Sequence, residues 1–193
     1  MLAGLFSLIS GMKKLYILLC AIFFSVITGF ISNKQLRFNV DERFSVELPN
    51  HPTSISRDTV EADGFEQHLK IFSSSDEYGL YRISRDDLNH ESDNYLTPQG
   101  RKEWYSVSPM VEGAVFRAKF IKRENFIIDG IEGVDRVYEL PASRQNEHTI
   151  KYVRSLLVDK VGYELWFIPK DGLKDPCINQ KKRFFNSIKL KSK

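Results

Sequence analysis

The chain has 193 residues, with 28 Lys and Arg against 25 Asp and Glu, so its formal net charge is +3. Residues 1–32 hold two of those lysines and no acidic residue, which leaves 26 basic against 25 acidic residues in the remainder. A nearly neutral domain gives no electrostatic reason to expect a nucleic-acid partner. The remainder, about 160 residues, suits one domain with its own core.

The most distinctive stretch begins with Lys13 and Lys14, which precede seventeen uncharged and mostly apolar residues. Such a run is short for a membrane-spanning helix and long for the apolar part of a signal peptide. Both interpretations leave the lysines in the cytoplasm and export the C-terminal remainder of the chain. We expect residues 1–32 to be an N-terminal extension plus a signal peptide or membrane anchor. If uncleaved, the anchor starts at Leu15 and ends at Ile31, and the domain is periplasmic or held outside the membrane.

The first eleven residues are also apolar and precede the lysines, which is unusual for a signal peptide. Met12 directly before the lysines is a natural start, so we expect translation to begin there. No good cleavage site comes after the apolar run, so cleavage stays open. The only cysteines are Cys20, in the leader, and Cys177. The domain therefore forms no internal disulfide, and we interpret Cys177 as a small hydrophobic residue near a helix start.

Residues 33–42 are polar and are expected to be a tether before a folded domain at 43–193. Period-two alternation, broken by Pro and Gly turns, predicts four strands in the first half of this domain. They are residues 44–48, 53–60, 65–72 and 79–85. Short connections favour an antiparallel meander of these four. Residues 73–77 and 86–94 are predicted loops.

A Thr-Pro pair predicts a helix starting at Pro98, which brings Trp104 onto an apolar face and which Pro109 should kink or end. A second helix should start at Asp175 and run to about Asn186. The remaining predicted strands are residues 115–121, 126–128, 134–140, 150–158, 163–168 and 188–190, with a tight turn at 129–133. Strand groups separated by helices predict an α+β fold, with a mostly antiparallel sheet and flanking helices.

Four segments of the sequence resemble the PsbP-like family, and most closely its uncharacterised exported bacterial members. They are RFSVELP (43–49), IIDGIEGVDRVYELP (127–141), VGYELWFIPKDG (161–172) and KRFFNSIKL (182–190). In the second segment, Gly130, Gly133 and Arg136 match the family's glycine turn followed by an Arg-containing strand. The resemblance covers about residues 43–190 and implies an α/β/α sandwich. It also implies a non-catalytic binding or assembly role without shared catalytic residues.

Motifs for nucleophilic hydrolysis and nucleotide binding do not occur in the sequence. The four histidines lack the spacing of metal ligands, and residues 86–93 lack the ligand order of a calcium loop. Asp129, Glu132 and Asp135 could serve acid–base chemistry, although an ordinary turn explains them better. We therefore predict no catalytic residue, no cofactor and no metal.

Trp104 and Trp166 are the candidate lining residues of a ligand groove. Residues 163–167 alternate across a strand, so their large side chains must face both sides of the sheet. If both faces of the sheet are covered, these side chains belong to the hydrophobic core, which is the favoured interpretation. If one face is only partly covered, they leave an apolar groove that could hold a peptide or acyl chain.

These observations predict an exported, non-catalytic binding or assembly protein of the bacterial cell envelope. We expect a monomer whose partner is an unknown envelope protein or lipid. Two alternatives stay open. One is a carrier of an apolar ligand, a lipid or acyl chain, held between helix and sheet. The other is an enzyme with an unrecognised site.

Overall fold

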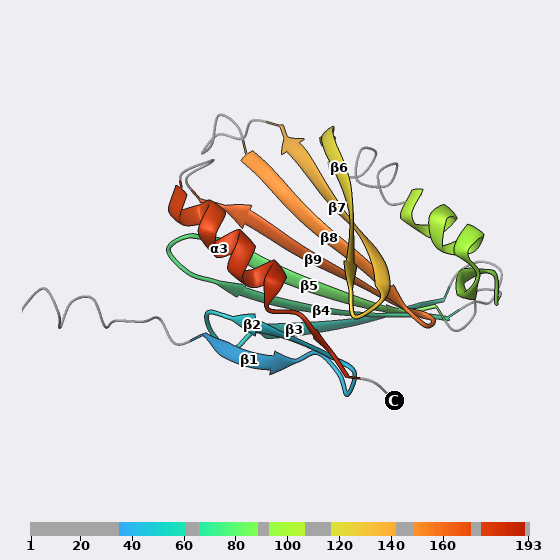
Figure 1. Cartoon of the computed structure of the whole chain (residues 1–193). Coiled ribbons are helices and arrows are strands. Elements are labelled where there is room, and N and C mark those ends of the chain that lie inside the picture. The colour runs from blue at the N-terminus through green and yellow to red at the C-terminus, as the bar shows by residue number, and fades with distance from the viewer. Residues whose placement is uncertain are drawn as a thin grey trace, which may run out of the picture. The chain divides into compact units, whose positions relative to one another are not determined.

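Two antiparallel sheets and two helices build the part of the chain that the computed structural model describes, residues 35–60, 66–88, 93–106, 117–141, 149–170 and 175–191 (Figure 1). The large sheet has seven strands in the order β3-β4-β5-β9-β8-β7-β6. Its strands are β3 (Thr53–Val60), β4 (Glu66–Ser75), β5 (Gly79–Asp87), β6 (Lys119–Ile128), β7 (Ile131–Leu140), β8 (Thr149–Val158) and β9 (Val161–Pro169). Every neighbouring pair is antiparallel, which confirms the predicted sheet type.

A separate three-stranded sheet is formed by β1 (Leu36–Asn39), β2 (Phe44–Leu48) and β10 (Lys189–Leu190), in the order β1-β2-β10. The predicted four-strand meander is therefore wrong in its first strand. β2 does not pair with β3 but lies between β1 and the C-terminal strand β10 in the small sheet. Phe44, Ser45 and Val46 are all buried, so β2 has no solvent face and serves as a central strand. β1 lies inside the range that we predicted to be a tether.

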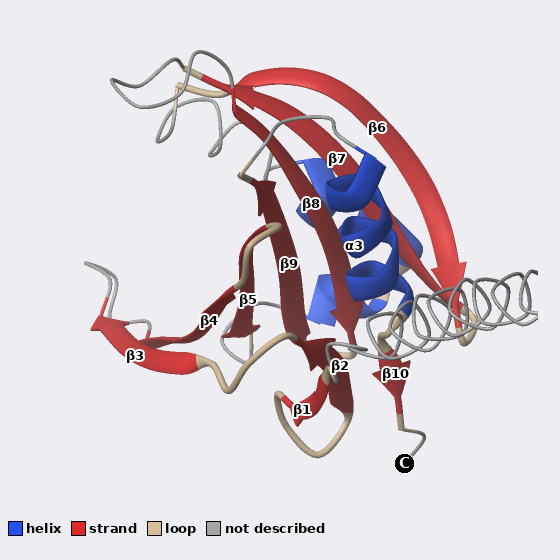
Figure 2. Ribbon diagram, turned by 90° about the vertical axis from the view of Figure 1, so that its left-hand side faces the viewer, coloured by secondary structure: helices blue, strands red, loops and turns tan. Residues whose placement is uncertain are grey.

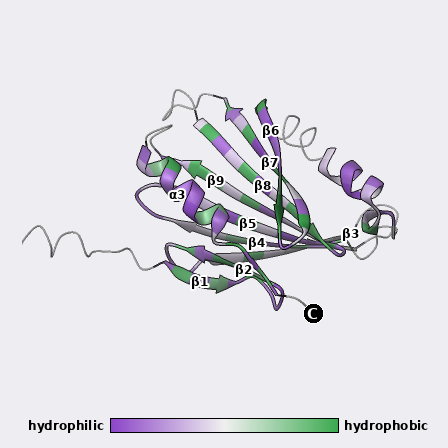
Figure 3. Cartoon of the chain, viewed as in Figure 1, coloured by the Kyte–Doolittle hydropathy of each residue, from purple (hydrophilic) through white to green (hydrophobic). Residues whose placement is uncertain are grey.

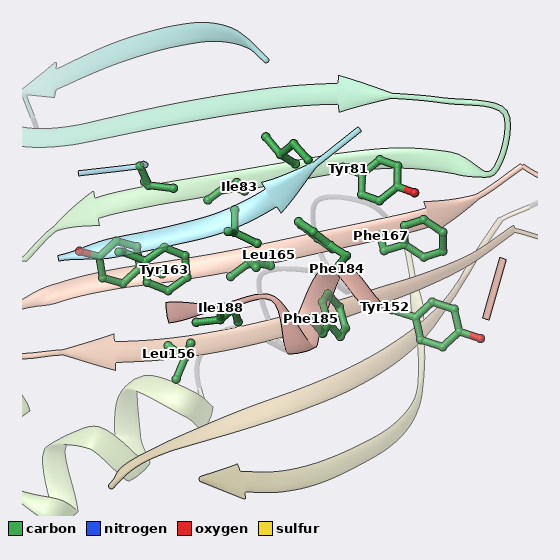
Figure 4. Close-up of a cluster of buried hydrophobic side chains, with 14 of the residues drawn as sticks. Tyr81, Ile83, Tyr152, Leu156, Tyr163, Leu165, Phe167, Phe184, Phe185 and Ile188 are labelled. Atoms are coloured by element: carbon green, nitrogen blue, oxygen red, sulfur yellow. The ribbon is translucent and has the colours of Figure 1, made fainter. Parts of the chain in front are cut away.

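The helix α3 (Asp175–Asn186) has the predicted bounds and, together with the small sheet, covers one face of the large sheet, here called the α3 face (Figures 1 and 2). Figure 4 shows the side chains that meet there, from β5, β8, β9 and α3. Phe44 stacks on Tyr163 with ring centroids 4.3 Å apart, and Tyr81 meets Phe184 edge-on at 5.2 Å. This aromatic cluster is the main core.

The opposite side of the large sheet, here called the tryptophan face, carries the alternate residues of the same strands. In β9, Tyr163, Leu165 and Phe167 are buried on the α3 face, so Trp166 points the other way. The alternation is visible as bands of colour along the strands (Figure 3). The helical residues 98–106, drawn yellow-green in Figure 1, cover one end of this face through Tyr105. Helices on both faces confirm the predicted flanking helices.

Two turns are tighter than predicted. Asp129 and Gly130, with φ of 49° and 78°, form a two-residue turn, so Ile131 already begins β7. Asp159 (φ 54°) and Lys160 likewise connect β8 to β9.

Other boundaries also differ from the prediction. Residues 73–75 and 86–87 belong to β4 and β5 rather than to loops, because both strands remain paired there. The strand predicted at 126–128 is the end of β6, which is continuous from Lys119.

Several predictions lie outside the described residues. They concern the leader at 1–32, Cys20, Pro109 and residues 89–92 of the segment 86–93. Within the described ranges, no helix is both long and apolar enough to cross a membrane.

Candidate functional site

The two tryptophans predicted to line a groove lie on the same face of the large sheet. Trp104, in the helix at 98–106, packs over Gly162, where an added Cβ would lie 2.7 Å from the indole Cζ2. Gly162 and Trp166 project from the same side of β9, four residues apart. None of the three pockets described below is lined by either tryptophan, so the groove itself remains a prediction.

Two cations lie close to the ring of Trp166, beside its buried neighbour Val153 on β8. The Lys151 Nζ lies 3.1 Å from its ring centroid, and the Arg82 guanidinium carbon lies 4.4 Å away. Lys151 is only 2% exposed. Cation–π attraction is strongest when the cation is desolvated, so these contacts hold the indole in place.

Arg136 lies on the tryptophan face of β7, next to the edge strand β6, and is 1% exposed. Its Nη1 donates to the Ser155 Oγ at 2.8 Å, and that hydroxyl donates to Glu164 at 3.0 Å. Its Nη2 donates to the backbone oxygen of Tyr105. Burial lowers the pKa of Arg136. The guanidinium thus ties the helix at 98–106 to three strands of the sheet, β7, β8 and β9.

Tyr105 is the second attachment of this helix. Its hydroxyl donates to the backbone oxygen of Glu132 at 2.7 Å and accepts from the Leu157 amide at 2.9 Å. Burial raises the pKa of Tyr105, so the phenol stays protonated at neutral pH. Sequence reasoning missed this role. The available signal was one buried aromatic residue beside Trp104 in a largely polar helix.

A polar cluster around Asp41 joins the two sheets on the α3 side. The Asp41 carboxylate accepts hydrogen bonds from Arg85 Nε at 2.8 Å, Tyr163 OH at 2.6 Å, and the amides of Arg43 and Phe44. Burial alone would raise the pKa of Asp41, but these bonds together lower it below its ordinary value. Arg85 also pairs with Asp87 at 2.5 Å.

An open pocket of about 740 Å³ lies beside this cluster and is lined by acidic and basic side chains in similar numbers. The carboxylates of Asp41 and Asp87 are held by Arg85, and Asp159 pairs with Arg43. Asp41, which is ion-paired and has a lowered pKa, is a poor proton donor near neutral pH. The arrangement is that of a structural clamp between the sheets.

A second pocket, of about 610 Å³, lies between the helix at 98–106 and strands β6 and β7; we call it the basic pocket. Its charged lining consists of Arg101, Lys102 and Arg123 against Glu132. The other lining residues are Leu96, Pro98, Tyr105, Asn125, Gly130, Gly133 and Val134. Within the described structure, the three cationic side chains make no ion pair or hydrogen bond, and the Arg101 Nε is buried without an acceptor. The basic pocket therefore carries uncompensated positive charge.

Strand β6 forms the edge of the large sheet next to the basic pocket, with β7 as its only described neighbour (Figure 2). Four of the six exposed large hydrophobic residues of the described chain lie on β6 or line this pocket. They are Leu96, Phe120, Ile121 and Ile127, the last 71% exposed. We call β6 with these side chains the β6 edge.

The remaining candidates do not assemble into a reactive site. Asp135 pairs with Arg154 at 2.7 Å on the α3 face, whereas Glu132 lies on the tryptophan face, so these carboxylates diverge. In the small pocket near His51, the Ser74 hydroxyl donates to the Asn50 backbone oxygen.

Cys177 is buried in the first turn of α3 with its thiol toward the Tyr78 carbonyl, as predicted for a small hydrophobic residue. The described residues contain no group of three or more His, Cys, Asp or Glu that could hold a metal ion.

Comparisons with known proteins identify the fold. Neither protein-family models nor curated protein sequences gave a match to this chain. Among solved structures, the chain is similar to the solution structure of cyanobacterial PsbP (CyanoP) from Synechocystis sp. PCC 6803. The TM-score is 0.50 at 12% sequence identity, over 84% of this chain and 96% of the other. The resemblance inferred from the sequence is thereby confirmed at the level of fold.

Proposed function

We propose that this PsbP-like domain is an exported, non-catalytic binding or assembly protein of the bacterial cell envelope. The observation that carries the proposal is the β6 edge, an edge strand paired on one side only in the described structure, whose exposed apolar side chains adjoin an uncompensated basic pocket. Exposed apolar groups gathered in one place commonly mark a surface that another molecule covers. The apolar run after Lys13 and Lys14 supports export.

The polar clusters of the described domain support binding rather than catalysis. Arg85 donates a hydrogen bond to Asp41 and so links the two sheets, and Arg136 donates hydrogen bonds to Ser155 and to a backbone carbonyl. Each of these groups has a structural role that accounts for its burial. An acid–base pair at work would instead need a poised pKa and access to substrate.

The alternative of an apolar-ligand carrier has weaker support. The two tryptophans do share one face, but the surface between them carries the charged and polar groups of Arg136, Ser155 and Glu164. Arg136 and Ser155 are already buried, but Glu164 is only half-buried, so an acyl chain laid across that surface would desolvate its carboxylate without replacing its contacts with water.

Site-specific photo-crosslinking of the full chain in its native host tests the proposal. A benzoylphenylalanine at Ile127 should form a discrete adduct with an envelope protein. The same probe at Ile55, which is 54% exposed on the opposite edge strand, is the matched control and should form less. Lipid adducts alone would favour the carrier, and the absence of any adduct at Ile127 would refute the binding role. Export is tested by cell fractionation, which should recover the domain in the envelope fraction and not in the cytoplasm.

A further inference from the structure

We infer that the basic pocket and the β6 edge together form a docking site for an extended, acidic segment of a partner protein. This inference rests on the proposed binding function and specifies the chemistry of its partner. It depends on three features of the described domain: unpaired cations, an open strand edge, and the order of side chains along β6.

Among the cations of the basic pocket, Lys102 and Arg123 are exposed and Arg101 is half-buried, and Arg101 differs from three other half-buried arginines of the domain. Arg37, Arg85 and Arg154 each pair with a carboxylate at 2.8 Å or less. In contrast, Arg101 and Arg123 find no carboxylate in the described chain, although Glu132 lines the same pocket. The missing anion is the group that a partner would supply.

The placement of Arg123 strengthens this argument. Arg123 lies directly opposite Arg136 in the β6–β7 pair, and both side chains project from the tryptophan face. Like charges opposite each other on neighbouring strands are destabilising. A carboxylate between Arg123 and the helix residues Arg101 and Lys102 would relieve that repulsion. The free domain thus holds an arrangement that an anion stabilises.

The strand edge indicates an extended chain as the carrier of the carboxylate. β6 pairs only with β7 among the described strands, so within the described structure no other strand occupies its outer backbone groups, which is the edge geometry that a further strand can join. Addition of a peptide to a sheet edge obtains affinity from main-chain hydrogen bonds and specificity from alternate side chains.

The side chains of β6 define the sequence that would fit. On the tryptophan face the strand presents, in order, Phe120, Arg123, Asn125 and Ile127, with an irregular register between 120 and 122. Apolar residues thus lie at both ends and a cation near the middle. The complementary segment has an acidic residue near its centre and apolar residues on either side. A lipid headgroup would satisfy the cations but would leave the strand edge unpaired.

The test is a selection of 12-residue peptides from a random displayed library on the solubilised full chain. Enriched peptides should carry Asp or Glu flanked by apolar residues. Their binding should fall at least tenfold in the variant R101Q/K102Q/R123Q and when their acids are replaced by amides. The matched control is K70Q/K182Q/K189Q, which removes the same charge from exposed lysines away from the pocket and should bind as the unsubstituted protein does. Hydrogen exchange should slow in the β6 amides on binding.

Several results would overturn the inference. One is enrichment of peptides without acids, and another is equal binding to both triple variants. A third is protection of β3 instead of β6. Charge-dependent binding to phosphatidylglycerol vesicles without any enriched acidic peptide would assign the cations to a lipid surface. If the Ile127 crosslink to an envelope protein persists in R101Q/K102Q/R123Q, the proposed function stands and this inference fails. If the unsubstituted chain gives no adduct, the proposed function itself fails.

Discussion

Tyr163 on β9 donates a 2.6 Å hydrogen bond to the carboxylate of Asp41, which lies 122 residues earlier in the turn between β1 and β2. The same carboxylate accepts from Arg85 on β5, so one side chain links the small sheet to two strands of the large one. Tyr163 also stacks on Phe44 of β2. This contact fixes how the two sheets pack, because it combines a polar and an aromatic link at one place.

Replacing Asp41 with Asn should lower the free energy of unfolding by about 1–3 kcal/mol. The amide keeps one acceptor oxygen but loses the charge that Arg85 and Tyr163 bind. Urea unfolding with an unchanged m-value measures the loss. The matched control is Glu42→Gln, an exposed neighbour with the same change of charge, which should stay within about 0.5 kcal/mol of the unsubstituted chain. Equal stability of D41N and E42Q would contradict the clamp.

The Asp41 clamp also predicts a pH dependence. Burial opposes ionisation of Asp41, but its hydrogen bonds outweigh burial and set the folded-state pKa below the ordinary 3.8. A lowered folded-state pKa means that the unfolded chain binds the proton first. The stabilisation is therefore complete above pH 3.8 and is lost as the pH falls through the lower folded-state value. The stability difference between the unsubstituted chain and D41N should shrink over that acidic range. A difference that stays constant on acidification would refute this assignment.

Most strand positions could be predicted from the sequence, because alternation along a strand is a local pattern. The alternation through Tyr163, Leu165 and Phe167 is an example, and the structure buries all three. The choice of the sheet that a strand joins depends on residues far away in the sequence. The partners of β2 are β1 and β10, and the latter lies about 140 residues away, so nothing near Phe44 indicated a second sheet.

The candidate site was predicted only in part, for the same reason. The two tryptophans could be selected by size, and the structure places both on one face. The basic pocket could not be predicted, because Arg101 lies on a helix and Arg123 on a strand, and the sequence does not indicate that these two elements pack together. The buried role of Arg136 was also hidden, since an arginine in an alternating strand is usually exposed.

Gly133 on β7 should not tolerate a side chain, although its backbone angle is not left-handed. A Cβ there would lie 2.3 Å from the Phe126 ring and 2.8 Å from the Ser155 backbone oxygen. Gly133→Ala should therefore destabilise the domain by about 1–3 kcal/mol, because the Phe126 ring must move and β7 must shift away from the Ser155 backbone of β8. Thermal unfolding measures this cost. At Gly130, with φ of 78° and open space around it, alanine should cost only about 1 kcal/mol through its backbone conformation. A larger loss at Gly130 than at Gly133 would contradict the close packing of Gly133 against Phe126 and β8.

Arg123→Gln should stabilise the free domain, by up to about 0.5 kcal/mol, because it removes one of two like charges opposite each other on β6 and β7. Most substitutions leave the free energy of unfolding unchanged or lower it, so an increase would be informative. The control is Lys122→Gln on the same strand, which breaks an ion pair with Glu124 at 2.6 Å and should be neutral or slightly destabilising. Chemical denaturation of both variants at low salt checks the difference. Destabilisation by R123Q would mean that this arginine is already compensated in the free domain.

Arg136→Met should detach the helix at 98–106 from the sheet before the rest of the domain unfolds. The substitution keeps much of the side-chain volume but removes the donors to Ser155 and to the Tyr105 carbonyl. A buried carbonyl and a buried hydroxyl then lose their partner, at a cost of about 2–4 kcal/mol. Arg136→Lys keeps the charge but not the planar fork, so it should recover only part of the loss.

Hydrogen exchange resolved along the chain distinguishes this local effect from general destabilisation. In R136M, amides at 98–106 should exchange much faster, whereas those of α3 on the opposite face should change less. Tyr105→Phe is the matched comparison, because it removes the hydrogen bonds to Glu132 and Leu157 from the same helix. Both variants should loosen the same segment. Uniform acceleration across α3 and the helix at 98–106 would show that Arg136 supports the whole core rather than this attachment, since the two helices share no face of the sheet.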